Sequence, residues 1–263
     1  MGLLQNKTVL VTGAASGIGQ ATAIKLGAEG AQLVITDIDE NGLANTLSQL
    51  KENDAEAIAI SFDVRNESKW QQVIAETLRS YKKLDGLVNC AGIVESKPIK
   101  ESSLEDFQHT LSVNLEGSFL GLKYAHSTMK SNPEGGAIIN ISSVVGQLGL
   151  PGYTSYSASK GGMRLMTKAA AIEFGIANTN IRANSVHPGS VDSPLLSNHL
   201  TSDQLSELKE SVPLKRLAHT EDIANTIAFL LSDGAKFMTG SEVTVDGGMS
   251  CRLALSMKEE HAQ

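Results

Sequence analysis

Short apolar runs alternate along the chain with longer segments in which apolar positions recur at helical spacing. The apolar runs are rich in Val, Ile and Leu and predict strands at 8–12, 32–36, 57–62, 84–89, 137–141, 181–186 and 242–245. The amphipathic segments predict helices at about 18–29, 40–53, 67–81, 104–129, 153–175, 203–209 and 220–231. Strands that are apolar throughout and alternate with helices are typical of a parallel sheet covered on both faces. Because connections between parallel strands are right-handed, the pattern predicts an α/β fold with a doubly wound, Rossmann-like parallel sheet.

The length of the chain fits a single domain. Its 263 residues, 41% of them hydrophobic, are enough to bury one large core. The sequence contains no linker, internal repeat or low-complexity tract that would divide it. We therefore expect one domain over residues 1–249, followed by a C-terminal tail over 250–263.

The charge balance and the cysteines restrict the classes of partner. Lys and Arg number 22 against 29 Asp and Glu, and a net charge of −7 argues against nucleic acid or an anionic membrane as partner. Two cysteines, Cys90 and Cys251, make no disulfide framework and suit a reducing compartment. Residues 1–10 do not resemble a signal peptide, and no apolar run reaches membrane-spanning length. We expect a soluble cytoplasmic protein with a small-molecule substrate and no metal site.

A glycine-rich turn lies between the first predicted strand and the first predicted helix. Residues 12–19 read Thr-Gly-Ala-Ala-Ser-Gly-Ile-Gly, a G-x-x-x-G-x-G spacing that differs from the commoner G-x-G-x-x-G fingerprint. Glycines let the backbone approach a pyrophosphate, and the helix N-terminus behind them presents free N–H groups to anionic oxygens. The turn therefore predicts dinucleotide binding, with contacts from Gly13, Ser16, Gly17, Ile18 and Gly19.

An acidic residue, Asp37, ends the second predicted strand. In a doubly wound sheet, an acid at this position accepts hydrogen bonds from the adenosine ribose hydroxyls and repels a 2′-phosphate. No Arg or Lys stands at residues 14–16 or at Ile38 to attract such a phosphate. The sequence therefore predicts NAD rather than NADP as the cofactor. The alternative is that Asp37 caps the helix that follows.

The ends of the next two predicted strands are candidates for the rest of the cofactor site. Asp63 is placed to contact an adenine edge with Val64 packed beside it, or else to cap the following helix. Small residues at Ala91 and Gly92 allow the backbone to approach a ribose or a nicotinamide. Asn89 suits a cofactor contact and a structural role that ties neighbouring strands together equally well.

Tyr156 and Lys160 form a candidate acid–base pair. Residues four apart on a helix lie on the same face, one turn from each other. A lysine charge stabilises a neighbouring phenolate, so we expect the pKa of Tyr156 to fall below its ordinary value near 10. A phenol tuned in this way serves as both a general acid and a general base.

Taken together, these residues resemble the short-chain dehydrogenase/reductase family. The matching motifs span nearly the whole chain: T-G-x-x-x-G-I-G at 12–19, N-x-A-G at 89–92, Asn114, Ser143, Y-x-x-x-K at 156–160, Pro188-Gly189 and V-D-G-G at 245–248. The chain departs from the family pattern at Cys90, where a second Asn is more frequent, and at Ser193, where Thr is common. Neither departure removes a catalytic group.

The resemblance implies a role for each matched position. Tyr156 would exchange a proton with the substrate oxygen, and Lys160 would lower the pKa of Tyr156 and bind the nicotinamide ribose. Ser143, rather than Ser142, would hold the substrate oxygen. Asn114 would kink its helix and seat a water that links Lys160 to solvent. The nicotinamide would be bordered by Pro188, Gly189, Val191 and Ser193.

A lone histidine, His187, precedes the Pro188-Gly189 turn. We expect it to be structural, because a tuned Tyr–Lys pair already supplies the proton. Purely structural roles also remain open for the matched positions. Ser142 or Ser143 would then simply end a strand, and Asn114 would hydrogen-bond only to backbone groups.

The resemblance implies reversible hydride transfer between NAD(H) and a secondary alcohol or ketone. We expect residues 190–215 to form a lid whose apolar face comprises Leu195, Leu196, Leu200, Leu205 and Leu208. The opposite wall would comprise Val94, Val145, Leu148 and Leu150. Since cations are scarce in these segments, we expect an apolar neutral substrate such as a cyclic alcohol, a steroid-like ketone or an aryl ketone. The alternative is that these leucines pack against the body of the protein.

Three other functions remain open at this point. A 3-oxoacyl-thioester reductase would prefer NADPH, a dinucleotide-binding sensor would bind without turnover, and a structural scaffold would show no redox signal. The resemblance also implies a homotetramer that pairs helices near 104–129 and 153–175, where small residues at Ala158, Gly161 and Gly162 permit close approach.

Overall fold

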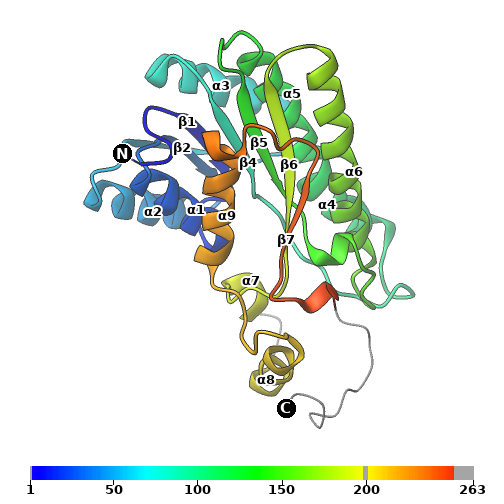
Figure 1. Cartoon of the computed structure of the whole chain (residues 1–263). Helices are drawn as coiled ribbons and strands as arrows, with labels where there is room; N and C mark the ends of the chain where they lie inside the picture. Colours follow the sequence, from blue (N-terminus) through cyan, green and yellow to red (C-terminus); the bar gives the residue numbers. More distant parts are fainter. Residues whose placement is uncertain (1, 198–200, 252–263) are drawn as a thin grey trace.

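The computed structural model describes residues 2–197 and 201–251 and contains one seven-stranded parallel sheet (Figure 1). Its strand order is β3-β2-β1-β4-β5-β6-β7, so the order reverses between β1 and β4. The strands are β1 (Thr8–Thr12), β2 (Gln32–Asp37), β3 (Ala57–Ser61), β4 (Gly86–Asn89), β5 (Gly136–Ile141), β6 (Ile181–Pro188) and β7 (Glu242–Val245). The predicted doubly wound α/β fold in a single domain is confirmed.

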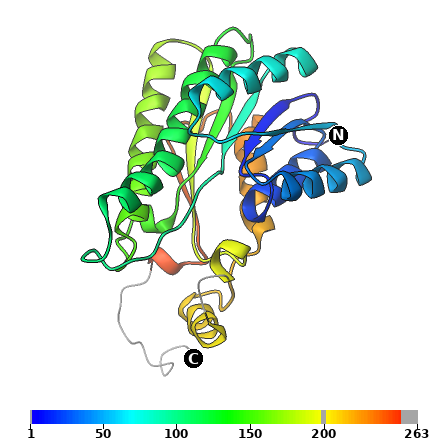
Figure 2. The same ribbon diagram turned by 180° about the vertical axis from the view of Figure 1, so that it is seen from behind.

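Helices cover both faces of this sheet (Figures 1 and 2). One face packs against α1 (Gly17–Ala28), α2 (Glu40–Glu52) and α9 (Thr220–Leu231). The other packs against α3 (Glu67–Tyr81), α5 (Gly117–Met129) and α6 (Thr154–Ile176), with α4 (Leu104–Leu111) preceding α5. Two short helices, α7 (Pro194–Ser197) and α8 (Ser202–Ser211), lie beyond the carboxyl edge of the sheet (Figure 1).

Alternating strand residues supply the two cores, which explains why the strands are apolar throughout. Val9 and Val11 of β1 belong to the core beneath α1 and α9, whereas Leu10 between them belongs to the core beneath α3 and α5. Every residue of β1 is buried. At about 25 cal/mol per Å² of apolar surface removed from water, such double coverage is the main stabilising contribution to the fold.

Most predicted boundaries agree with the structure to within one or two residues. The largest difference is the segment predicted as one helix over 104–129. It is interrupted by a π-helical turn, η1 (Ser112–Glu116), between α4 and α5. The loops at the carboxyl ends of β1, β2, β4, β5 and β6 gather at one edge, next to the reversal of strand order where such sheets bind ligands. None of the described helices is both long and apolar enough to cross a membrane.

Candidate functional site

The helix α6 presents Tyr156 and Lys160 on one face, as their spacing predicts. The Lys160 ammonium lies 5.7 Å from the centroid of the Tyr156 ring, and the lysine is 4% exposed. Its Nζ donates to the carbonyl oxygen of Ile141 at the end of β5, at 2.7 Å. Burial lowers the pKa of Lys160 to about 8, because desolvation disfavours the charged form.

The expectation that the pKa of Tyr156 falls below its ordinary value is not borne out. Burial raises the pKa of Tyr156 to about 12, and a hydrogen bond with Ser143 acts in the opposite direction without overcoming it. Desolvation is therefore the dominant influence on the pKa of Tyr156. At neutral pH the phenol keeps its proton and is poised as a general acid.

The two serines after β5 have different partners. Ser142 donates its hydroxyl to the carbonyl oxygen of Lys160 at 2.8 Å, so it ties the strand end to α6. The Ser143 hydroxyl accepts from the backbone N–H of Val145 at 3.1 Å and is hydrogen-bonded with Tyr156. This arrangement leaves Ser143, rather than Ser142, as the serine that faces the phenol.

Asn114 lies fully buried within the π-helical turn η1. Its Oδ1 accepts from the backbone N–H of Ile93 at 2.8 Å, and its Nδ2 donates to the carbonyl oxygen of Ile93 at 2.9 Å. Nδ2 also lies 3.1 Å from the hydroxyl of Ser159 on α6. A Cβ added at Gly92 would lie 3.2 Å from Asn114 Oδ1 and 3.4 Å from Lys160 Nζ. Asn114 thus joins the loop after β4 to α6, beside Lys160.

The turn between β1 and α1 has the close backbone packing that a pyrophosphate cradle needs. Gly13 has φ +69°, and a Cβ there would lie 2.7 Å from Ala91. A Cβ on Gly19 would collide with the carbonyl oxygen of Gly13. Ser16 occupies the N-cap of α1 without a side-chain capping bond, so its side chain does not occupy the first N–H groups of the helix, and Ser16, Gly17 and Ile18 line the cavity. These residues fit the phosphates of a dinucleotide.

The carboxylate of Asp37 is held in place by backbone N–H groups on both sides. One oxygen accepts from Ala15 at 3.0 Å, and the other accepts from Ile38 at 2.7 Å. The alternative role as a helix cap belongs instead to Asp39, whose side chain accepts from the N–H groups that begin α2. Ile38 is 70% exposed although it is apolar, which leaves a face for an adenine ring.

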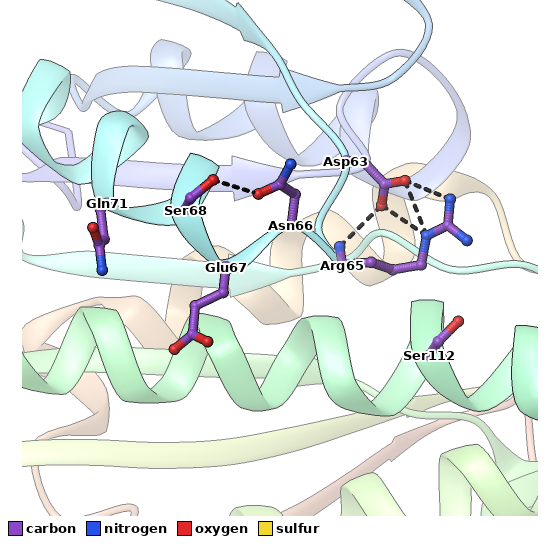
Figure 3. Close-up of a pocket in the computed structure, with 7 residues that line it drawn as sticks. All are labelled: Asp63, Arg65, Asn66, Glu67, Ser68, Gln71 and Ser112. Atoms are coloured by element: carbon purple, nitrogen blue, oxygen red, sulfur yellow. Dashed lines mark hydrogen bonds and ion pairs between the residues drawn. The ribbon is translucent and has the colours of Figure 1, made fainter.

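Asp63 has a partner that the sequence did not indicate. Arg65 donates from Nε to both carboxylate oxygens of Asp63, at 3.0 and 2.9 Å, and this pairing lowers the pKa of Asp63. Figure 3 shows the pair at the rim of a surface pocket of about 840 Å³, with Ser112 across from it. Asn66 rather than Asp63 caps α3.

A single cavity of about 780 Å³ gathers nearly all the predicted site residues. Its lining includes Gly13, Ser16, Gly17, Ile18, Gly19, Asp37, Ile38, Asp63, Val64, Ala91, Gly92, Ser143, Tyr156, Lys160, Pro188, Gly189, Val191 and Ser193. Two predicted residues are not part of that lining: Asn89 and Asn114. The Asn89 amide is 2% exposed and donates to Ser118 and Asn140 below the cavity, which corresponds to its structural role and not to a side-chain contact with the cofactor.

The substrate end of the cavity is largely apolar. The predicted residues Val94, Val145, Leu148 and Leu150 line it, and so do Leu196 and Leu208 from α7 and α8. Leu205 is not in the lining, and the predicted contributions of the Leu195 side chain and of Leu200 lie outside the described part of the structure. The prediction missed Tyr153, whose ring packs edge-on against Tyr156 at 6.5 Å between centroids, and Met249.

This combination of fold and site defines an oxidoreductase of the short-chain dehydrogenase/reductase family, and the chain belongs to that family. The family model described as "Enoyl-(Acyl carrier protein) reductase" matches residues 13–250. Comparison with curated proteins gives relatives that act on alcohols. The chain is 36% identical to cyclopentanol dehydrogenase of Comamonas testosteroni over 94% of its own length and 98% of that protein.

Two further relatives bear on the cofactor and the substrate. The NADP-dependent (R)-specific alcohol dehydrogenase of Lentilactobacillus kefiri is 33% identical, over 95% of this chain and 98% of that protein. The crystal structure of levodione reductase superposes with a TM-score of 0.91 at 32% identity, covering 95% of this chain and all of that one. The chain is therefore an oxidoreductase of alcohols or ketones that uses a nicotinamide dinucleotide.

Proposed function

We propose that the protein is an NAD-dependent dehydrogenase/reductase of apolar or cyclic secondary alcohols and ketones. The observation that carries the proposal is the single cavity in which Ser143, Tyr156 and Lys160 meet the glycine turn and Asp37. When bound, the nicotinamide supplies or accepts the hydride.

Side chains of the protein bind the substrate oxygen and transfer its proton. Tyr156 donates its phenolic proton to that oxygen in ketone reduction and takes one back in alcohol oxidation. The Ser143 hydroxyl donates a second hydrogen bond to the oxygen, so that both hydroxyls stabilise the negative charge that develops there. Lys160, held by Ile141, places a buried positive charge beside the phenol.

The preference for NAD over NADP rests on Asp37. Its carboxylate is fixed by Ala15 and Ile38, and a 2′-phosphate at the adenosine ribose would bring two negative charges together. The Asp37→Ala variant should lose NADH affinity and gain relative NADPH affinity, measured by fluorescence titration. An unchanged ratio of the two dissociation constants would exclude this assignment.

The proposed substrate class follows from the lining of the cavity. Its outer part is built from aliphatic side chains and the Tyr153 ring, which suits a compact apolar ring. Two similar proteins carry names of cyclic substrates, cyclopentanol and levodione. We also propose that α7 and α8 form the lid of this site within one domain spanning 1–249, with residues from 250 onward as a tail.

A second candidate is a reductase of acyl thioesters, which the description of the matching family model favours. Among the described residues that line the cavity, the cations are Arg65 and Lys160, and Arg65 is paired with Asp63. Such a lining offers little to a phosphorylated thioester carrier. A panel of cyclic alcohols and of acyl thioesters, tested with NAD(H) and with NADP(H) and followed by the absorbance of the reduced cofactor, separates the two candidates.

We also propose a homotetramer. Apolar side chains stay exposed along the outer faces of the two helical segments predicted to pair: Leu104, Phe119, Leu165, Ile172 and Ile176. Exposed apolar faces of this kind mark protein interfaces, and light scattering tests the state.

The decisive test of the mechanism is Tyr156→Phe. The exchange removes one hydroxyl, so turnover should be lost while NADH binding, measured by fluorescence, persists. Retention of most of the activity would exclude Tyr156 as the proton donor. Binding of NADH without turnover of any substrate by the unaltered protein would instead favour a dinucleotide sensor.

A further inference from the structure

We propose that His187 is a positioning residue for catalysis, which holds the Ser143 peptide in place through its Nδ1–H. The proposal rests on the proposed function only in taking Ser143 as the residue that binds the substrate oxygen. His187 lies in β6, beside the loop that follows β5, and its side chain is fully buried. It does not line the cavity, so it acts through Ser143 and not on the substrate.

Two hydrogen bonds define the tautomer of His187. Nδ1 lies 3.1 Å from the carbonyl oxygen of Ser143, and Nε2 lies 2.8 Å from the hydroxyl of Ser185. A carbonyl oxygen only accepts, so Nδ1 carries the proton. Nε2 then accepts from the Ser185 hydroxyl, and this second hydrogen bond fixes the orientation of the ring.

The surroundings keep this ring neutral. Burial is the largest influence on His187 and lowers its pKa. The charged groups that act on it are Glu242 of β7, which favours the cation, and Arg164 and Lys160 of α6, which oppose it. The neutral Nδ1–H form is therefore the resident state at neutral pH.

The position of His187 matters because its ring binds the Ser143 carbonyl itself, whereas the bonds of Gln147 to Glu242 and Thr244 of β7 hold the loop four residues farther along. The Ser143 carbonyl accepts from Gly146 at 3.0 Å, but Gly146 belongs to the same loop and moves with it. The preceding residue is tied through Ser142 N–H to Val186 at 2.8 Å. His187 extends this attachment by one residue, to the peptide that carries the Ser143 hydroxyl. A displacement of the order of 1 Å in such a group reduces turnover by about a hundredfold.

Two matched substitutions separate the two hydrogen bonds of the ring. His187→Asn keeps an amide N–H at the distance of Nδ1 and loses the bond with Ser185. His187→Gln reaches Ser185 and leaves the Ser143 carbonyl without its donor. We expect kcat to stay within about threefold in the Asn variant and to fall by about tenfold or more in the Gln variant, with NADH affinity unchanged.

The pH profile adds a readout that a purely structural role would not change. Because the bond with Ser143 lowers the pKa of Tyr156, a displaced Ser143 should shift the profile for alcohol oxidation to higher pH in the Gln variant only. Equal kcat values and equal pH profiles in the two variants would overturn the proposal, and so would losses that merely track thermal stability.

The tautomer is tested on the unaltered protein, whether or not the variants fold. In ¹⁵N-histidine-labelled protein, the His187 ring should show a protonated Nδ1 and an unprotonated Nε2 at pH 7. A ring protonated at Nε2 alone would overturn the proposal, because Nδ1 would then face the carbonyl without a proton. This measurement needs no substrate. A failure to oxidise any secondary alcohol would refute the proposed function and leave the tautomer result standing.

Discussion

Replacing Lys160 with methionine should stabilise the protein while it abolishes turnover. Lys160 is 4% exposed and keeps its ammonium inside the sheet edge, with the Ile141 carbonyl as its hydrogen-bond acceptor. A methionine of similar length fills the same space without a charge. The catalytic role proposed for the ammonium is lost, whereas the cost of burying it disappears.

The size of the effect follows from the lowered pKa of Lys160. A fall from 10.5 to about 8 corresponds to a destabilisation of about 3 kcal/mol at neutral pH, at about 1.4 kcal/mol for each pKa unit. The methionine leaves the Ile141 carbonyl without this donor, which costs about 1 kcal/mol. The free energy of unfolding should therefore rise by about 2 kcal/mol at pH 7 in urea titrations.

The gain should vanish at high pH, and the sign follows from proton binding. Between pH 8 and 10.5 the unfolded chain still holds the Lys160 proton while the folded protein has released it. Wild-type stability therefore increases relative to the variant over this window. At pH 10 the penalty has shrunk to about 1 kcal/mol, which the unpaired Ile141 carbonyl offsets.

A surface exchange of the same type serves as the control. Lys69 lies on the exposed side of α3, and Lys69→Met should change the stability by no more than about 0.5 kcal/mol. The reasoning is refuted if Lys160→Met is less stable than the wild type at pH 7. It is equally refuted if the advantage is the same at pH 7 and pH 10.

Three further predictions concern the proton, the cradle and the thiols. Because the pKa of Tyr156 is raised to about 12, the phenolate that oxidation needs becomes more abundant as pH rises. Alcohol oxidation should therefore accelerate between pH 7 and pH 10, while ketone reduction stays constant near neutrality. A flat pH profile for oxidation in stopped-flow measurements would contradict this. Gly13→Ala places a Cβ 2.7 Å from Ala91 at φ +69° and should weaken NADH binding at least tenfold. The backbone strain alone is on the order of 1–2 kcal/mol. The control Gly175→Ala, whose added Cβ has nothing within 4 Å, should leave NADH binding unchanged. The half-buried Cys90 thiol lines the cavity, and desolvation raises its pKa to about 12, so a thiol reagent should modify exposed Cys251 much faster than Cys90 in the native protein and both thiols readily after denaturation.

The architecture was predictable because its signals are local and repeated. Strands such as 8–12 and 242–245 and helices such as 67–81 and 220–231 have the predicted bounds. Each carries either a continuous apolar run or a clear helical period, and the turns between them contain glycine or capping residues. The sheet then requires the glycine turn and the Tyr–Lys pair to share one edge, and the cavity contains both.

What escaped prediction depends on contacts between distant segments. Nothing in the order of residues indicates that His187 lies against Ser143, since this pair forms only when β6 meets the loop after β5. The π-helical turn at Asn114 is likewise set by its bonds to the loop after β4. The raised pKa of Tyr156 is the clearest case, because burial is a property of the whole fold and spacing along α6 reports only the neighbour.

The perturbed pKa values of Tyr156 and Lys160 have a common consequence once negative charge develops on the substrate oxygen. Before the reaction, burial destabilises the charged form of both groups. It lowers the pKa of Lys160, and it raises the pKa of Tyr156 so that the phenol keeps its proton. In the proposed mechanism, Tyr156 gives its proton to the developing alkoxide and a phenolate appears beside the ammonium in a medium of low effective dielectric, where their attraction is much stronger than in water. Under that mechanism, the burial that destabilises the Lys160 ammonium in the ground state would favour the transition state selectively, which is the condition for raising kcat and not merely affinity. A site that gave Lys160 a carboxylate partner would remove the destabilisation and the rate enhancement together.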